Sequence, residues 1–221
     1  MHVRYALTIA LLATALTASP SLAQLCEGRP GADAGSAQLG AGVAVGNRAR
    51  EFGVSISALG KRAYGAASVG SVSFNDFTGT ATSYGVAVGY QLAVGASGRA
   101  QLCPFVSGSL GFGPKDIRGT GVDLSTRGAG AGLAWGFRAA RSLEFGLVPT
   151  ISAAFGSSSA TLTDGVDDLT ESKTFGQLGI GLGFMFGQQF AVRPAAIIPL
   201  GLEGADPVVE LTISLTLGSR R

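Results

Sequence analysis

The strongest constraint on this chain is an alternation of large apolar and small residues with a period of two, which indicates β-strands. In the last segment, every second residue is large and apolar: Val209, Leu211, Ile213, Leu215 and Leu217. The positions between them carry Glu, Thr and Ser. The same alternation recurs along the chain. We expect ten strands, at about 38–46, 51–59, 64–74, 83–94, 101–112, 127–139, 143–155, 175–186, 189–200 and 209–217.

The small-residue face of these strands decides between a soluble and a membrane-embedded sheet. A hydrated face would carry Lys, Glu and Arg, but here it is mainly Gly, Ala, Ser and Thr. Charged residues make up only 14% of the chain, and 35 of its 221 residues are Gly. The large apolar residues then point outward, which is favourable only in lipid, and strands in lipid must close into a barrel. We therefore expect an all-β fold, a closed antiparallel transmembrane β-barrel of about ten strands. Eight strands is the alternative count, and a soluble barrel or sandwich is the competing interpretation.

The N-terminus has the pattern of a Sec-type export signal. A basic region ending at Arg4 precedes an apolar run to Thr17 and a small-x-small site that ends at Ala23, where we expect cleavage. The apolar run is shorter than the ~20 residues of a spanning helix. Leu25 precedes Cys26, where a lipoprotein signal needs a small residue, so lipidation is set aside. The expected regions are a signal peptide (1–23), a periplasmic segment (24–36), an outer-membrane barrel (37–218) and a basic tail (219–221).

The connections between the expected strands are unequal in length. With the N-terminus in the periplasm, the turns on that side fall near 60–63, 95–100, 140–142 and 187–189. The outward loops fall near 47–50, 75–79, 113–126, 156–174 and 201–207. Short periplasmic turns and longer outer loops are typical of outer-membrane barrels. Aromatic girdles are expected near the strand ends, at Tyr84, Trp135, Phe145, Phe155, Phe175 and Phe186.

With this signal, alternation and loop asymmetry, residues 38–217 resemble the small outer-membrane β-barrel proteins of Gram-negative bacteria. The resemblance implies a place in the cell outer membrane, contact with its lipid and lipopolysaccharide, and insertion by the outer-membrane assembly machinery. Such barrels commonly end in an aromatic residue, whereas this chain ends Leu217-Gly218-Ser219-Arg220-Arg221.

Cys26 and Cys103 are the only cysteines, and both are expected at the periplasmic end of the barrel. We hypothesise a disulfide that ties segment 24–36 across the periplasmic mouth, because the periplasm is oxidising. On the chain-entropy model such a bond would stabilise the fold by up to ~4.5 kcal/mol. Two separate thiols are the alternative, since the sequence does not show how far apart the side chains lie.

Five charged residues are expected on the lumen face: Glu51, Arg138, Glu144, Arg193 and Glu210. Arg138 and Glu144 flank a periplasmic turn, so we expect an ion pair there. Arg193 and Glu210 fall on neighbouring strands, where a second pair is possible. Buried charges are normally paired; the alternative is that they line a narrow water path and set its ion selectivity.

The residue inventory disfavours catalysis, cofactors and metals. The only histidine, His2, lies in the signal, so a Ser–His dyad or a His base is absent from the rest of the chain. Two cysteines without histidine do not make a zinc site. The acidic positions Asp164, Asp167, Asp168 and Glu171 lack EF-hand spacing. We expect no enzyme, no cofactor, no metal and a solvated acidic loop, with a lipid A-modifying enzyme as the remote alternative.

The charge balance excludes nucleic acid as a partner. Sixteen basic residues face 14 acidic ones, without a basic block. We expect a monomer with a structural or surface-interaction role, and the alternative is a narrow passive pore for small solutes or ions. Small barrels are filled by their own side chains, which favours the structural role. The glycine-rich lumen face favours the pore.

Overall fold

The computed structural model describes Cys26 and residues 36–60, 62–75, 79–94, 99–114, 122–141, 145–163, 168–187, 189–202 and 205–217. The expected signal peptide with its cleavage site at Ala23, the tail at 219–221 and most of segment 24–36 lie outside these residues. Among the described residues, no helix is long and apolar enough to cross a membrane.

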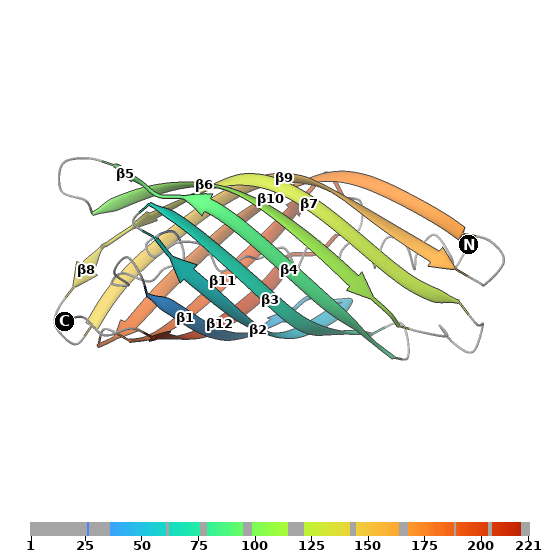
Figure 1. Cartoon of the computed structure of the whole chain (residues 1–221), viewed down its shortest axis with the longest axis horizontal. Helices are drawn as coiled ribbons and strands as arrows, with labels where there is room; N and C mark the ends of the chain where they lie inside the picture. The colour runs from blue at the N-terminus through green and yellow to red at the C-terminus, as the bar shows by residue number, and fades with distance from the viewer. Residues whose placement is uncertain are drawn as a thin grey trace.

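The described chain forms a single antiparallel sheet that closes on itself (Figure 1). The strands are β1 (Ala37–Val45), β2 (Ala49–Leu59), β3 (Ala63–Phe74), β4 (Thr80–Tyr90), β5 (Leu92–Val94), β6 (Ala100–Phe112), β7 (Asp123–Phe137), β8 (Ala140–Arg141), β9 (Phe145–Thr163), β10 (Asp168–Phe186), β11 (Phe190–Leu200) and β12 (Val208–Leu217).

Closure comes from β1, which pairs with β2 on one side and with β12 on the other. In this register Ala37 faces both Ala58 and Leu217. The short β5 follows β4 and pairs with the same neighbour, β6, while β8 follows β7 and pairs with β9. The twelve segments therefore build ten barrel strands, which confirms the predicted closed antiparallel barrel and its strand number.

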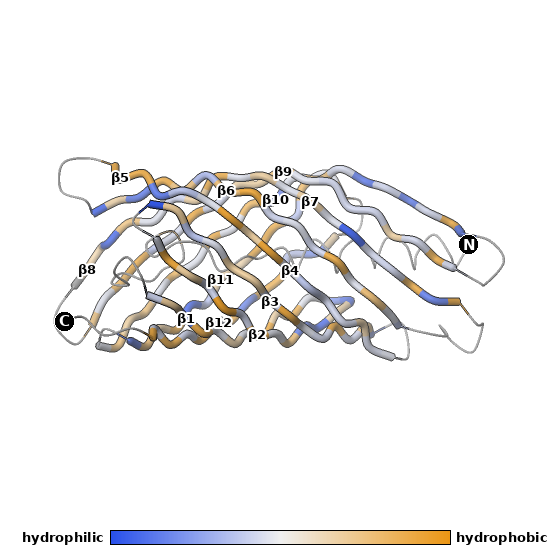
Figure 2. The backbone as a smooth tube through the Cα atoms, in the orientation of Figure 1, coloured by the Kyte–Doolittle hydropathy of each residue, from blue (hydrophilic) through white to orange (hydrophobic). Residues whose placement is uncertain are grey.

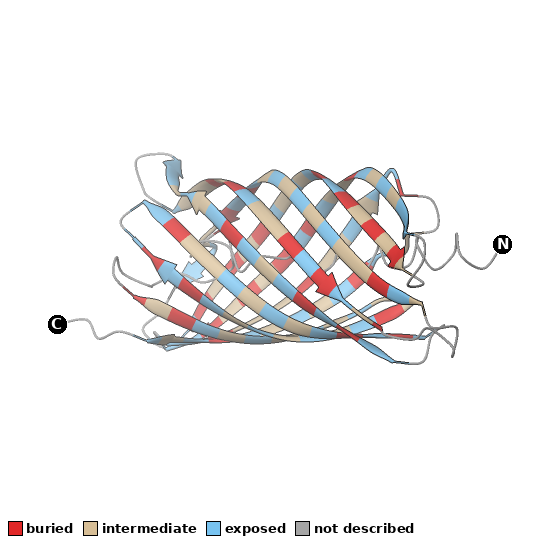
Figure 3. Ribbon diagram, turned by 45° about the vertical axis from the view of Figure 1, so that its right-hand side comes forward, coloured by how far each residue is buried: buried red, intermediate tan, exposed pale blue. Residues whose placement is uncertain are grey.

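Burial alternates along the strands, as the banding in Figure 3 shows. Large apolar side chains occupy the outward positions on every side of the barrel, and the orange positions in Figure 2 follow the same alternation. Phe52, Phe155 and Val209 keep 56%, 66% and 62% of their surface exposed. An apolar surface that surrounds the whole molecule is unfavourable in water but favourable against hydrocarbon. This exterior is that of a membrane-spanning barrel, in which every backbone group is paired between strands.

Two strands are much longer than the sequence predicted. The expected outer loop at 156–174 is mostly strand, because β9 continues to Thr163 and β10 begins at Asp168. The loop expected at 113–126 is also shortened, since β7 begins at Asp123. As a result β7, β9 and β10 project beyond their neighbours at one end of the barrel (Figure 1). We call the part of these three strands formed by residues 123–127, 157–163 and 168–174 the extension.

Candidate functional site

The lumen wall is built from side chains that lie across glycines of the neighbouring strand. Glu51 on β2 crosses Gly70 of β3, and the Ser83 hydroxyl on β4 donates a 2.9 Å hydrogen bond to its carboxylate. A Cβ atom at Gly70 would lie 2.7 Å from both Glu51 Oε1 and Ser83 Oγ. A side chain at position 70 would therefore have to displace Glu51 and Ser83 from this contact.

The same arrangement recurs around the lumen. Tyr64 lies over Gly89, and Phe105 over Gly132. On the other side of the barrel, a Cβ atom at Gly181 would lie 2.8 Å from Nε of Arg193. Glycine in a strand normally weakens it, and close approach of another group is a usual reason for its presence. Glycines of the lumen face thus accommodate neighbouring side chains, so glycine content alone does not indicate an open channel.

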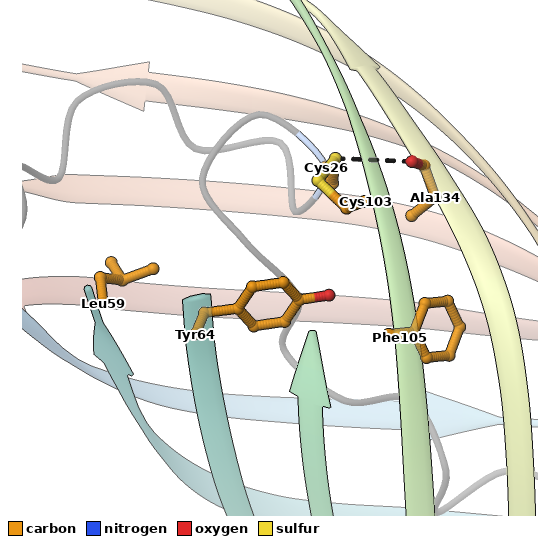
Figure 4. Close-up of a cluster of buried hydrophobic side chains, with 6 residues drawn as sticks. All are labelled: Cys26, Leu59, Tyr64, Cys103, Phe105 and Ala134. Atoms are coloured by element: carbon orange, nitrogen blue, oxygen red, sulfur yellow. Dashed lines mark hydrogen bonds between the residues drawn. A yellow bond between two sulfur atoms is a disulfide. The ribbon is translucent and has the colours of Figure 1, made fainter. Parts of the chain in front are cut away.

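An apolar cluster occupies the barrel end that carries the short turns. The sulfur atoms of Cys26 and Cys103 are bonded at 2.03 Å. The cluster consists of buried residues from the N-terminal segment and four strands: Cys26, Leu59, Tyr64, Cys103, Phe105 and Ala134. Figure 4 shows the Tyr64 ring extending from β3 in the direction of Phe105, across the neighbouring strand β4.

The disulfide ties the N-terminal segment to the inside of the barrel wall. Cys26 Sγ lies 3.5 Å from the carbonyl oxygens of both Gln101 and Ala134. Cys26 and Cys103 are 2% and 0% exposed, so this bond is covered from solvent. The Cys103 side chain thus lies on the buried, inner side of β6.

The lumen charges Glu51, Arg193 and Glu210 are arranged differently from the pair predicted between Arg193 and Glu210. Glu51 and Glu210 lie in the same row of the sheet, since each faces Ala44 of β1, from β2 and from β12. Thr212 donates a 2.7 Å hydrogen bond to Glu210. The Arg193 side chain lies over Gly181 of β10 and forms no ion pair with Glu210, although both residues are described.

The other proposed pair is not tested, because Glu144 lies outside the described residues. Its expected partner, Arg138, is half-buried at the end of β7.

The extension has two different faces. On its outer face, three side-chain hydrogen bonds join facing residues of β9 and β10. They link Ser159 to Ser172 at 2.8 Å, Thr161 to Thr170 at 2.9 Å and Thr163 to Asp168 at 2.7 Å. We call these contacts the hydroxyl ladder. On the inner face Leu124, Ala160 and Leu162 are buried. This element was not predicted from the sequence, although Ser157, Ser159, Thr161 and Thr163 place a hydroxyl at every second position.

Two of the acidic residues in the loop expected at 156–174, Asp168 and Glu171, lie instead on strand β10. Asp168 accepts the hydroxyl hydrogen bond from Thr163, and the Glu171 carboxylate pairs with Lys173 Nζ at 3.2 Å. Asp164 and Asp167 lie outside the described residues. Within the part of the chain that the structure describes, no three potential metal ligands come together.

One residue of the predicted aromatic girdles faces inward. Tyr84, Trp135, Phe145, Phe155 and Phe186 all have exposed side chains, as expected of a girdle. Phe175 is instead 8% exposed and packs with Leu202. The prediction for Phe175 was wrong because it shares the inward parity of Gln177 and Gly179 on β10.

No known protein family matches this sequence, and no curated protein matches it. Solved structures with similar architecture include outer-membrane proteins. The N-terminal β-barrel domain of Pseudomonas aeruginosa OprF is 14% identical over 83% of this chain and 98% of that chain, with a TM-score of 0.42. Ail of Yersinia pestis, in complex with the heparin analogue sucrose octasulfate, is 14% identical over 84% of this chain and 100% of that chain, with a TM-score of 0.42. The KdgM porin, in complex with disordered oligogalacturonate, is 6% identical over 82% of this chain and 99% of that chain, with a TM-score of 0.45.

Proposed function

We propose that this chain is a non-enzymatic β-barrel of the bacterial outer membrane with a structural and surface-interaction role. The extension, a rigid and hydrated wall of three strands, is the interacting element. The barrel is exported by its signal peptide, inserted by the outer-membrane assembly machinery, and acts as a monomer in contact with outer-membrane lipid and lipopolysaccharide. It uses no cofactor and binds no nucleic acid.

The observation that carries this proposal is the change of polarity along the outer face of β9. Phe145, Ile151 and Phe155 are apolar and exposed, whereas beyond Phe155 the outward positions are Ser157, Ser159, Thr161 and Thr163. Apolar surface belongs in hydrocarbon and hydroxyl-rich surface in water. The boundary therefore supports a membrane surface near residue 156, with the extension outside it. Because the buried inner face holds the extension in shape, a partner meets a preformed surface.

The passive pore is the alternative function, and the lumen charges favour it. Glu51, Arg193 and Glu210 all lie on the inner face. Against it stands the apolar cluster at the short-turn end, in which Tyr64 and Phe105 are buried together with the two bonded cysteines. Conductance across a planar bilayer separates the two functions. We expect the oxidised protein to be silent; steady, discrete conductance steps would favour the pore.

The surface role is tested by an epitope tag placed between Thr163 and Asp168. In intact Gram-negative cells that express the full chain, we expect antibodies to label this tag without permeabilisation. A matched tag placed between Gly187 and Gln189, at the opposite end of the barrel, should be labelled only after the outer membrane is opened. Labelling of the second tag alone in intact cells would reverse the orientation, and labelling of neither would refute a surface role.

A further inference from the structure

A groove of about 420 Å³ crosses the outer surface of the barrel between β4 and β9. Its floor is a row of small outward residues on adjacent strands, because Gly108 faces Ala129 and Ala129 faces Ser157. A Cβ atom at Gly108 would make only ordinary contacts, at 3.8 Å from the Gly128 carbonyl oxygen and from Val86 Cγ2, so no side chain crosses the floor at this point. The volume falls in the range of small-molecule sites.

The rim of the groove is built from larger side chains. Val86 of β4 faces Gly108 of β6. Tyr84 and Leu110 face each other in the next outward-facing pair of the same two strands, on the side nearer the extension. Val86 and Leu110 are 62% and 50% exposed, so they rise above the floor. These side chains form walls on either side of a floor of small residues. An elongated apolar group such as an acyl chain fits between them.

A single charged side chain, Arg127, lines the groove. Arg127 faces Leu110 on one side and Ser159, the first rung of the hydroxyl ladder, on the other. It therefore lies at the boundary between the apolar band and the extension, where lipid headgroups sit. Among the described residues, no ion-pair partner of its exposed guanidinium is present. Guanidinium groups bind phosphate through paired, charge-assisted hydrogen bonds.

We propose that this groove binds lipopolysaccharide through its lipid A portion. One acyl chain lies along Gly108 and Ala129, and Arg127 holds a phosphate of the headgroup, with Ser157 and Ser159 beside it. This proposal deepens the proposed function and rests on it in one respect: the extension must lie on the outer side of the membrane. The lipid next to the groove is then that of the outer leaflet, whose phosphorylated lipid is lipopolysaccharide.

The test measures binding of diphosphoryl lipid A to the purified, folded full chain by native mass spectrometry in detergent. We expect Arg127→Gln to weaken binding about tenfold or more, as for the loss of a charged hydrogen bond. Gly108→Leu and Ala129→Leu fill the groove and should weaken binding to a similar degree. The matched controls are Arg50→Gln, an exposed arginine at the same end of β2, and Ala41→Leu, a small exposed position on β1. Both controls should bind within about twofold of the unmodified protein.

Each outcome decides the proposal. Equal binding by all variants would overturn it, and so would loss in Arg127→Gln alone, because the acyl chain would then not lie in the groove. Lipid A without phosphates should bind the unmodified protein about as weakly as the intact lipid binds Arg127→Gln; full binding of that lipid would also overturn it. These measurements are made in detergent, so their outcome does not depend on the result of the epitope labelling that tests the surface role.

Discussion

The Ser83 hydroxyl on β4 donates a 2.9 Å hydrogen bond to the Glu51 carboxylate on β2, and Gly70 of β3 lies between them. A side chain from one strand thus reaches the next strand but one. This contact is possible because the intervening strand has no Cβ atom at the crossing. The lumen is in this sense a packed interior in which the missing side chains of glycines are replaced by those of neighbouring strands.

Gly70→Ala should destabilise the barrel by about 1–3 kcal/mol, as overpacking of a filled interior does. The added methyl group would push Glu51 away from Ser83. The measurement is the denaturant or temperature midpoint at which the folded band is lost in unboiled gel samples. Gly65→Ala, on the opposite face of the same strand, meets its nearest atom at 3.8 Å and should change stability by less than about 0.5 kcal/mol. Equal midpoints for the two variants would contradict the crossing.

The barrel class and the strand number could be predicted from the sequence because both rest on local patterns. Residues such as Val209, Leu211 and Ile213 alternate with small or polar ones over a whole strand. The outer ends of β9 and β10 were missed for the opposite reason. Their strand positions are filled by Ser and Thr, which also populate loops, and the pairing between strands, such as that of Ser159 with Ser172, shows that they form a sheet.

The contacts between strands were beyond the reach of the sequence. The direction in which Arg193 points, toward Gly181 and not toward Glu210, depends on the stagger between β10, β11 and β12. The groove at Gly108 depends in the same way on which small residues become neighbours across three strands. The stagger between strands is a property of the closed barrel. It cannot be predicted from the sequence of any single strand.

Removal of the disulfide in a Cys26→Ser/Cys103→Ser variant should lower stability by up to about 4.5 kcal/mol, because the two residues are 77 positions apart and the bond restricts the unfolded chain. The measurement is again the midpoint of unfolding, compared with that of the unmodified protein before and after reduction. Unreduced, unfolded protein should show no thiol that reacts with a maleimide. Two reactive thiols in that sample would contradict the bond.

The register of the extension predicts a new crosslink. Ser159 and Ser172 face each other directly, and their hydroxyl oxygens are 2.8 Å apart. Because directly opposed Cα atoms lie about 4.5–5.5 Å apart, a Ser159→Cys/Ser172→Cys variant should form a disulfide on mild oxidation. The displaced pair Ser159→Cys/Thr174→Cys should not. Mass spectrometry of digested, alkylated protein distinguishes the two variants, and equal crosslinking of both would indicate a mobile loop in place of strands.

Trp135 offers a direct test of the lipid-facing surface, because it is the only tryptophan in the chain. Its side chain points outward near the short-turn end, is 36% exposed and stacks on Phe137 at a centroid distance of 6.0 Å. In vesicles we expect its fluorescence to be quenched by brominated lipids, most strongly by those brominated near the headgroup, since tryptophan in such barrels belongs to the interfacial girdles. Water-soluble quenchers should have little access to it until the protein is unfolded. Strong quenching by a soluble quencher, with none by brominated lipid, would instead support the soluble barrel that the alternation alone left open.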